Sequence, residues 1–159
     1  MFAYFAGGCF WCITPTFADI DGVIKVTSGY CGGDEVNPTY EDVKKQKTNH
    51  RETIKIEYDE NKVDYRSLLK IFFDNVDLYD EGGQYIDRGH SYTLAVYYID
   101  DNQKKIIEEE LSKYDKQVFV SVEKYKMFYD AEEYHQDYYL KHPKEFEEEL
   151  INSGRRKIW

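Results

Sequence analysis

The sequence predicts an α+β domain in which helices pack on a mixed β-sheet. Several short segments have the alternation or the β-branched content of strands, and segments with helical spacing stand between them. The two kinds do not alternate strictly, as they would in a doubly wound parallel sheet. A chain of 159 residues with no repeat or linker fits one unit with a real core, so we predict a single domain over residues 1–159.

The first segments predict a strand, a sharp turn and a helix. Residues 1–6 form a short apolar run, which is typical of a buried strand. The glycines at positions 7–8 let the backbone turn, and we expect a helix to open near Cys9 or Phe10. Pro15 would remove a backbone hydrogen bond from that helix, so either a later start or a kink stays open.

The next segments predict two strands and a second helix. Residues 23–30 are β-branched and predict a strand, which a turn-rich loop over residues 31–39 follows. Residues 51–58 alternate between apolar and polar side chains, which indicates a half-buried strand. Asp64 is a good N-cap for a helix with apolar residues at positions 68–73.

The remaining segments predict two more strands and further helix. Residues 74–91 form a long polar loop of a kind that is usually functional or disordered. Residues 92–99 and 118–122 predict strands, and residues 102–114 predict a helix between them. From position 130 to position 153 the pattern favours helix.

The charge and composition exclude two classes of partner. The formal net charge of −10 argues against a nucleic-acid backbone, which a basic face would be needed to attract. No apolar run approaches the length needed to cross a bilayer. The start of the chain lacks a basic leader, so we expect a cytoplasmic protein with neither a nucleic-acid nor a membrane partner.

The three cysteines are Cys9, Cys12 and Cys31, and an odd count does not predict a framework of structural disulfides. Cys9 follows the expected strand and glycine turn, at the start of the expected helix. Free backbone N–H groups and the helix dipole favour a thiolate there, and the thiolate is the reactive form of cysteine. Cys9 is therefore a candidate nucleophile with a lowered pKa.

Three other interpretations of the cysteines stay open at this point. Cys9 and Cys12 could pack as small apolar core residues, since free cysteine is often buried. The two could form half of a zinc site that Cys31 and His50 complete, in a non-catalytic interaction module. The spacing also fits a thioredoxin-type dithiol, although the order of elements does not suit that fold.

Several separated segments across most of the chain form one pattern. They are residues 7–11 (GGCFW), 28–33 (SGYCGG), 37–43 (NPTYEDV), 50–52 (HRE), 87–89 (DRG), 91–92 (SY), 128–129 (FY), 131–132 (AE) and 134–136 (YHQ). Together these segments resemble the peptide methionine sulfoxide reductase A family. The resemblance implies a two-layer α+β sandwich with a ferredoxin-like core. It implies reduction of the S epimer of methionine sulfoxide, free or in proteins, with thioredoxin or another thiol as reductant and without a metal or other cofactor.

The same resemblance implies a role for individual residues. Cys9 is expected to be the nucleophile, with Glu52 as the acid beside it and Asp87 as a supporting carboxylate. Tyr40 and Tyr92 are expected to place their hydroxyls around the sulfoxide oxygen. Phe10 and Trp11 are expected to form the pocket for the substrate methyl group.

These roles agree with the chemistry of a sulfoxide. Its sulfur carries a polar oxygen and an apolar methyl group, so a site needs hydrogen-bond donors on one side and aromatic surface on the other. Attack by a thiolate places charge on the departing oxygen, which then needs a proton. An aromatic, poorly hydrated pocket would raise the pKa of Glu52 for that task. Cys9 would become a sulfenic acid, which a second thiol condenses to a disulfide.

One departure from the family concerns that second thiol. Many members keep resolving cysteines near the carboxy terminus, and this chain has none there. Cys12 and Cys31 are the internal candidates, and an external thiol is the other possibility. We slightly favour Cys12, although two cysteines one helical turn apart would need a local distortion to form a disulfide. We expect only a structural, hydrogen-bonding role for His135.

Overall fold

The computed structural model describes residues 1–153 and 155. The predicted domain range, 1–159, also includes residues 154 and 156–159, which lie outside the described residues. Within the described part of the chain, no helix combines the length and the apolar character needed to cross a membrane.

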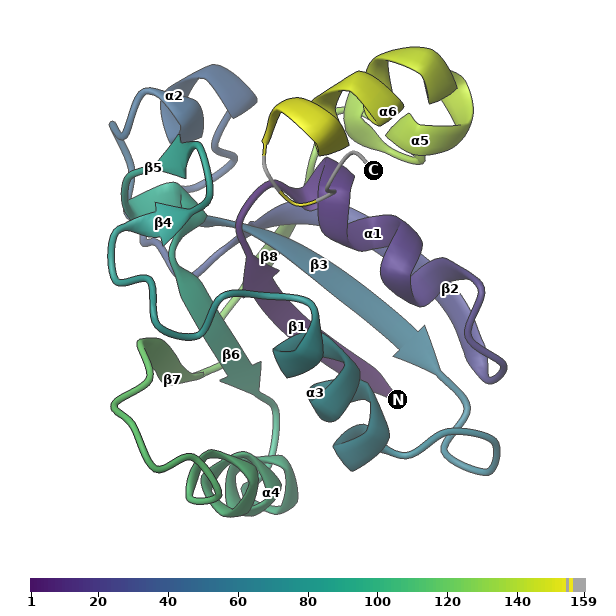
Figure 1. Ribbon diagram of the computed structural model, residues 1–159, viewed down its shortest axis with the longest axis vertical. Coiled ribbons are helices and arrows are strands. Elements are labelled where there is room, and N and C mark those ends of the chain that lie inside the picture. Colours follow the sequence, from purple (N-terminus) through teal and green to yellow (C-terminus); the bar gives the residue numbers. More distant parts are fainter. Residues whose placement is uncertain (154, 156–159) are drawn as a thin grey trace.

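A six-stranded sheet with the order β7-β6-β1-β3-β2-β8 lies at the centre of the molecule (Figure 1). Neighbouring strands are antiparallel, except that β6 and β7 are parallel. The predicted α+β class with a mixed sheet is therefore confirmed. The strands are β1 (Phe2–Gly7), β2 (Val23–Cys31), β3 (Arg51–Tyr58), β6 (Leu94–Tyr98), β7 (Val120–Lys124) and β8 (Phe128–Asp130).

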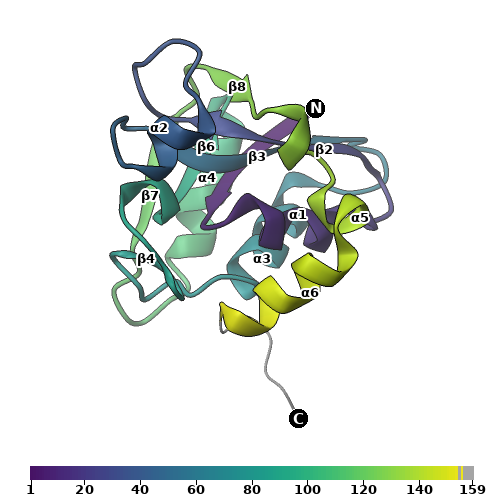
Figure 2. The same cartoon turned by 90° about the horizontal axis from the view of Figure 1, so that it is seen from above.

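Helices cover one face of this sheet. Helices α1 (Phe10–Ala18) and α3 (Tyr65–Asp74) pack on it, and α4 (Asp101–Leu111) lies beside α3 and against β6 (Figure 1). Two further helices, α5 (Tyr138–Lys141) and α6 (Pro143–Asn152), lie next to α1 (Figure 2). The short α2 is Tyr40–Lys44.

The alternation of strand residues divides the core into two parts. Phe5, Ile54 and Ile56 point toward the helices and are 0% exposed. Tyr4 and Cys31 point to the other face and join a smaller apolar cluster there. Because successive side chains of a strand point to opposite faces, Tyr30 and Cys31 are separated by the thickness of the sheet.

The local signals at two helix starts agree with the structure. The Asp64 carboxylate accepts a hydrogen bond of 2.8 Å from the Ser67 N–H and caps α3, as predicted. Helix α1 begins at Phe10 and continues past Pro15 to Ala18. The helix therefore does not start later, and Pro15 lies inside it.

Several elements in the second half of the chain differ from those predicted. Residues 90–92 form a 3₁₀ turn, η1 (His90–Tyr92), so the strand predicted over residues 92–99 is only Leu94–Tyr98. The polar loop over residues 74–91 contains a small hairpin, β4 (Gly83–Gln84) and β5 (Asp87–Arg88).

The chain after position 130 is not one continuous helix. It forms the 3₁₀ turn η2 (Glu133–His135) and then α5 and α6. Asp137 has a left-handed backbone with φ 51°, which ends the first segment and redirects the chain. This break lets η2 pack against the start of α1, where a single straight helix would have carried it away.

We expect Phe72→Ala to destabilise the protein by about 3–5 kcal/mol, because Phe72 is 0% exposed and its removal leaves a cavity in the core. Its ring stacks on Phe5, with ring centroids 4.8 Å apart. Chemical denaturation measures the change, and Val36→Ala, at a side chain that is 73% exposed, is the control. A loss below about 1 kcal/mol for Phe72→Ala would contradict this packing.

Candidate active site

Cys9 lies where β1 turns into α1. Gly8 has φ +87°, and a Cβ atom there would lie 2.6 Å from the Arg155 guanidinium, so both the conformation and the space require glycine. Cys9 follows as the N-cap of α1, with an extended backbone at φ −60° and ψ 119°. Its sulfur thus lies at the helix end where backbone N–H groups lack intrahelical partners, as predicted.

Cys9 and Cys12 contact each other through their thiols, which form a hydrogen bond. Cys9 is the N-cap residue of α1 and Cys12 is its third residue, so one helical turn separates them. The local distortion expected for a disulfide between them stays a prediction.

The two thiols have opposite pKa shifts. Donation to Cys12 and burial together raise the pKa of Cys9 well above its usual range, and the acidic groups of Glu52 and Asp87 act in the same direction. The pKa of Cys12 is lowered, first by the hydrogen bond from Cys9 and further by Arg155. The lowered pKa predicted for Cys9 at the helix start is thus wrong, because the hydrogen bond with Cys12 and burial both disfavour ionisation of Cys9.

Glu52 joins β3 to the start of α1. Its side chain is 1% exposed, and Oε1 accepts a hydrogen bond of 3.1 Å from the Phe10 N–H. Oε2 has no hydrogen-bond partner. Burial raises the pKa of Glu52 to about 8, while the Phe10 N–H opposes the shift. The carboxyl group therefore keeps its proton at neutral pH, as an acid for a departing oxygen requires.

Three further side chains surround Cys9 and Glu52. Tyr40, Asp87 and Tyr92 come from α2, β5 and η1, and each interacts electrostatically with both Cys9 and Glu52. Burial raises the pKa of both tyrosine hydroxyls, so they remain donors at neutral pH. Burial also raises the pKa of Asp87. The structure thus brings the predicted nucleophile, acid, supporting carboxylate and hydroxyls together.

Aromatic rings form the apolar side of the site. Trp11 stacks on Tyr138, with ring centroids 4.0 Å apart, and its indole N–H donates to Nδ1 of His135 at 3.0 Å. The His135 ring in turn lies 4.2 Å from the Tyr40 ring. Phe10 is only 1% exposed, so Trp11 is the predicted pocket residue that offers open surface.

The segment around η2 holds this aromatic wall in place. Glu132 accepts hydrogen bonds from the Tyr30 hydroxyl at 2.8 Å and from the Tyr40 N–H at 3.0 Å. The Gln136 amide bonds both backbone groups of Ser28 in β2, at 2.9 Å and 2.8 Å. His135 thus has the hydrogen-bonding role that we expected. It is part of a segment, Glu132–Gln136, that positions Trp11 and Tyr40 and that we call the clamp.

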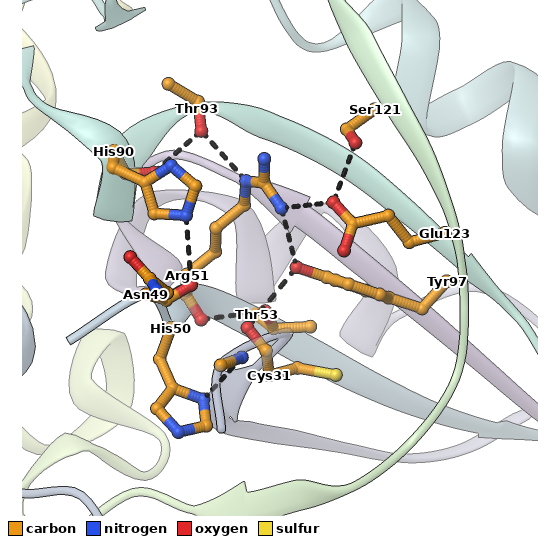
Figure 3. A network of polar contacts seen from close by, with 11 residues as sticks. Cys31, Asn49, His50, Arg51, Thr53, His90, Thr93, Tyr97, Ser121 and Glu123 are labelled. Carbon is orange, nitrogen blue, oxygen red and sulfur yellow. Dashed lines mark hydrogen bonds and ion pairs between the residues drawn. The ribbon is translucent and has the colours of Figure 1, made fainter. Parts of the chain in front are cut away.

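A polar network around Arg51 includes Thr93, Tyr97 and Glu123 (Figure 3). Arg51 precedes Glu52 and therefore points away from it. Its Nε donates to the Thr93 hydroxyl at 2.8 Å, and Nη1 bonds Glu123 at 2.7 Å and Tyr97 at 3.1 Å. Thr93 follows Tyr92 in the chain, so Arg51 ties the turn that carries the hydroxyl to β3.

The residues of the zinc interpretation do not converge. Cys31 lies on the far face of the sheet from Tyr30, in the cluster with Tyr97. The His50 ring is occupied, since Nδ1 accepts from the Gly33 N–H and Nε2 lies 2.8 Å from the Glu35 carbonyl. Within the described residues, no group of three or more His, Cys, Asp or Glu side chains could hold a metal ion.

The sequence interpretation missed several residues around the site. Glu132 and Gln136 belong to a quoted motif but carried no assigned role, and Tyr138 and Arg155 were not singled out. Their contacts join positions more than 90 residues apart, such as Tyr40 with Glu132. The available signal was the composition of residues 131–136, which combines hydrogen-bonding side chains with a histidine in an otherwise acidic segment.

The family model for peptide methionine sulfoxide reductase matches residues 1–159. The peptide methionine sulfoxide reductase MsrA of Bacillus licheniformis is 43% identical over 159 residues, which cover 96% of this chain and 88% of that protein.

Solved structures have the same fold. Reduced Mxr1 from Saccharomyces cerevisiae aligns with a TM-score of 0.82 at 28% identity, over 91% of this chain and 86% of that one. Mxr1 in complex with Trx2 aligns with a TM-score of 0.55 at 21% identity, over 84% and 81% of the two chains.

We expect the free energy of unfolding of the wild type to fall by about 3 kcal/mol between pH 5 and pH 8, relative to that of Glu52→Gln. The pKa of Glu52 rises from 4.5 to about 8 on folding. Between these values the folded state holds a proton that the unfolded state has lost, so wild-type stability falls with pH. Glutamine keeps the acceptor for the Phe10 N–H and removes this dependence.

Urea denaturation of both proteins at pH 5 and pH 8 measures the difference. Glu57→Gln, on the same strand but away from the site, controls for the substitution itself. Parallel pH dependence of the wild type and Glu52→Gln would contradict a protonated Glu52 in the folded protein.

Proposed function

Since the chain belongs to the peptide methionine sulfoxide reductase family, we propose that it reduces methionine S-sulfoxide, free or in proteins, with Cys9 as nucleophile. The single observation that carries the proposal is the place of Cys9. Its sulfur lies at the start of α1 beside the buried acid Glu52, whose pKa is raised to about 8 by burial. The activity serves the repair of oxidised methionine.

The first step transfers oxygen from the substrate sulfur to Cys9. The Cys9 sulfur attacks, the sulfur–oxygen bond of the sulfoxide breaks, and the substrate sulfur gains two electrons. Methionine leaves, and Cys9 becomes a sulfenic acid that carries the oxygen and one proton. Glu52 supplies a proton as charge develops on the departing oxygen and regains one from the Cys9 thiol, so the step leaves Glu52 protonated. Its unpartnered Oε2 is the free position for that contact.

The surrounding groups divide according to the two sides of a sulfoxide. The Tyr40 and Tyr92 hydroxyls stabilise the oxygen, and their raised pKa keeps them protonated. Asp87 adds negative charge, which helps to keep the proton on Glu52. Trp11, fixed by its bond to His135, receives the methyl group, and Phe10 supports it from beneath.

Cys12 is the thiol we assign to the second step. Its sulfur attacks the Cys9 sulfur, a disulfide forms, and the hydroxyl leaves as water once it has gained a proton. The hydrogen bond between the two thiols and the lowered pKa of Cys12 support this assignment. Cys31 lies on the other face of the sheet and would have to cross it.

An external dithiol then regenerates the enzyme, and we propose thioredoxin for this role. Support comes from the structure of Mxr1 in complex with Trx2, a protein of the same fold. The reaction needs Cys9 as a free thiol, and the three cysteines are unpaired in the described structure. A reducing compartment such as the cytoplasm suits this requirement.

The reaction is tested with dabsyl-methionine S-sulfoxide and, separately, with the R epimer, using dithiothreitol as reductant. We expect turnover of the S epimer alone, and its loss in Cys9→Ser. Cys31→Ser is the matched control, since that thiol lies away from the site and its removal should leave turnover within about threefold. Absence of S-epimer turnover by the folded wild type would refute the proposal.

The role of Cys12 is tested by single turnover without a reductant. We expect Cys12→Ser to form one equivalent of methionine per Cys9, as the wild type does, while the intramolecular disulfide is absent by mass spectrometry. A dimedone adduct on Cys9 should accumulate instead, because the sulfenic acid persists. A disulfide in Cys12→Ser at the wild-type rate would transfer the role to Cys31.

A further inference from the structure

Arg155 reaches back from the end of α6 to the turn that carries Cys9. Its guanidinium donates to the Gly7 carbonyl at 2.7 Å and lies 4.9 Å from the centre of the Tyr85 ring. Its backbone N–H bonds the Ser153 hydroxyl at 3.3 Å, which fixes the approach from α6. The Nε atom is buried without a hydrogen-bond partner.

The residue that receives Arg155 has an unusual conformation. Tyr85 has φ 56°, in the left-handed region that non-glycine residues rarely adopt. It stands between β4 and β5, so the same hairpin that presents Asp87 also presents the ring beneath the guanidinium. Backbone strain of this kind persists where surrounding structure holds it, and it clusters at functional sites.

Arg155 and Cys12 line one cavity of about 420 Å³ on the α6 side of α1. Asp74 from the end of α3 and Leu150 from α6 line it as well. Cys12 is 7% exposed and is one of the residues that line this cavity. The cavity does not include Cys9, Glu52 or Tyr92 and is therefore separate from the sulfoxide side of the site.

The charges that act on Cys12 come from several elements. The Cys9 thiol donates a hydrogen bond to the Cys12 sulfur. Two acidic residues, Asp87 from β5 and Glu149 from α6, and one basic residue, Arg155, also act on it. Burial, Asp87 and Glu149 all oppose a negative charge on the Cys12 sulfur, and Cys9 and Arg155 favour it. Oxidation converts the Cys9 thiol to a sulfenic acid, whereas the charge of Arg155 is unaffected by that step.

We propose that Arg155 is a positioning residue for the second step: held on the Gly7 carbonyl, it places a positive charge at the cavity that Cys12 lines and favours attack of the Cys12 sulfur on oxidised Cys9. The inference rests on the proposed function and assigns a role to a residue that follows α6. In that step Cys12 supplies the electron pair, the new bond joins the two sulfurs, and the sulfenic hydroxyl leaves as water once it has gained a proton.

Single turnover of Arg155→Met with one equivalent of methionine S-sulfoxide separates the two steps. Methionine keeps the apolar stem of the side chain and removes its charge. We expect the yield of methionine in the first turnover to remain, and disulfide formation at pH 7 to slow about tenfold, as a shift of one pH unit implies. Arg155→Lys should restore most of the rate, and Lys116→Gln, a distant exposed charge, should leave it unchanged.

A second measurement follows the ionisation of the Cys12 thiol itself. In the Cys9→Ser, Cys31→Ser background, the rate of alkylation of Cys12 by iodoacetamide is followed against pH. We expect a midpoint below the ordinary thiol value of about 8.5, and an upward shift of about one pH unit when Arg155→Met is added. A mere structural role for Arg155 would leave this midpoint in place.

The outcomes test the proposed function, the role of Cys12 and the role of Arg155 separately. No methionine in the wild-type first turnover would refute the proposed function itself. Methionine without a Cys9–Cys12 disulfide in the wild type would refute the role of Cys12, and with it the role of Arg155. An unchanged disulfide rate in folded Arg155→Met, or an alkylation midpoint that Arg155→Met leaves in place, would refute the role of Arg155 alone.

Discussion

The site depends on one hydrogen bond, from the Phe10 N–H to the buried Glu52 carboxyl group. It satisfies a first-turn donor of α1 that Cys9, the N-cap residue, does not satisfy with its side chain. It also fixes the angle between α1 and β3, and hence the distance from the thiol to the acid. Because Glu52 is buried among aromatic groups, the same contact that organises the helix start leaves an acid that holds its proton at neutral pH.

The second constraint is the position of the two thiols at the N-cap and at the third residue of α1. That geometry gives the two thiols opposite pKa shifts: the pKa of Cys9 is raised and that of Cys12 is lowered. This order of pKa values suits a reaction in which Cys9 acts on bound substrate and Cys12 acts immediately afterwards.

Long-range contacts give the site its rigidity. The clamp Glu132–Gln136 holds Trp11 and Tyr40 from one side, and the Arg51 network holds the turn of Tyr92 from the other face of the sheet. The clamp contacts Trp11 and Tyr40 directly, and the Arg51 network holds Thr93, the residue after Tyr92. Rigid placement matters here because donors aimed at a developing charge act only when they need no rearrangement.

The sequence by itself determined the class of fold, the start of α1 at the glycine turn, the capped start of α3 and the strand of residues 51–58. These follow from local periodicity, capping and backbone chemistry, which neighbouring residues decide. The order of strands, the 3₁₀ turn at Tyr92 and the break at Asp137 depended on tertiary packing. Spacing along the chain also could not decide the direction of the Cys9 pKa shift. That shift depends on the hydrogen bond with Cys12, on burial and on the acidic groups of β3 and β5, which only the folded structure brings together.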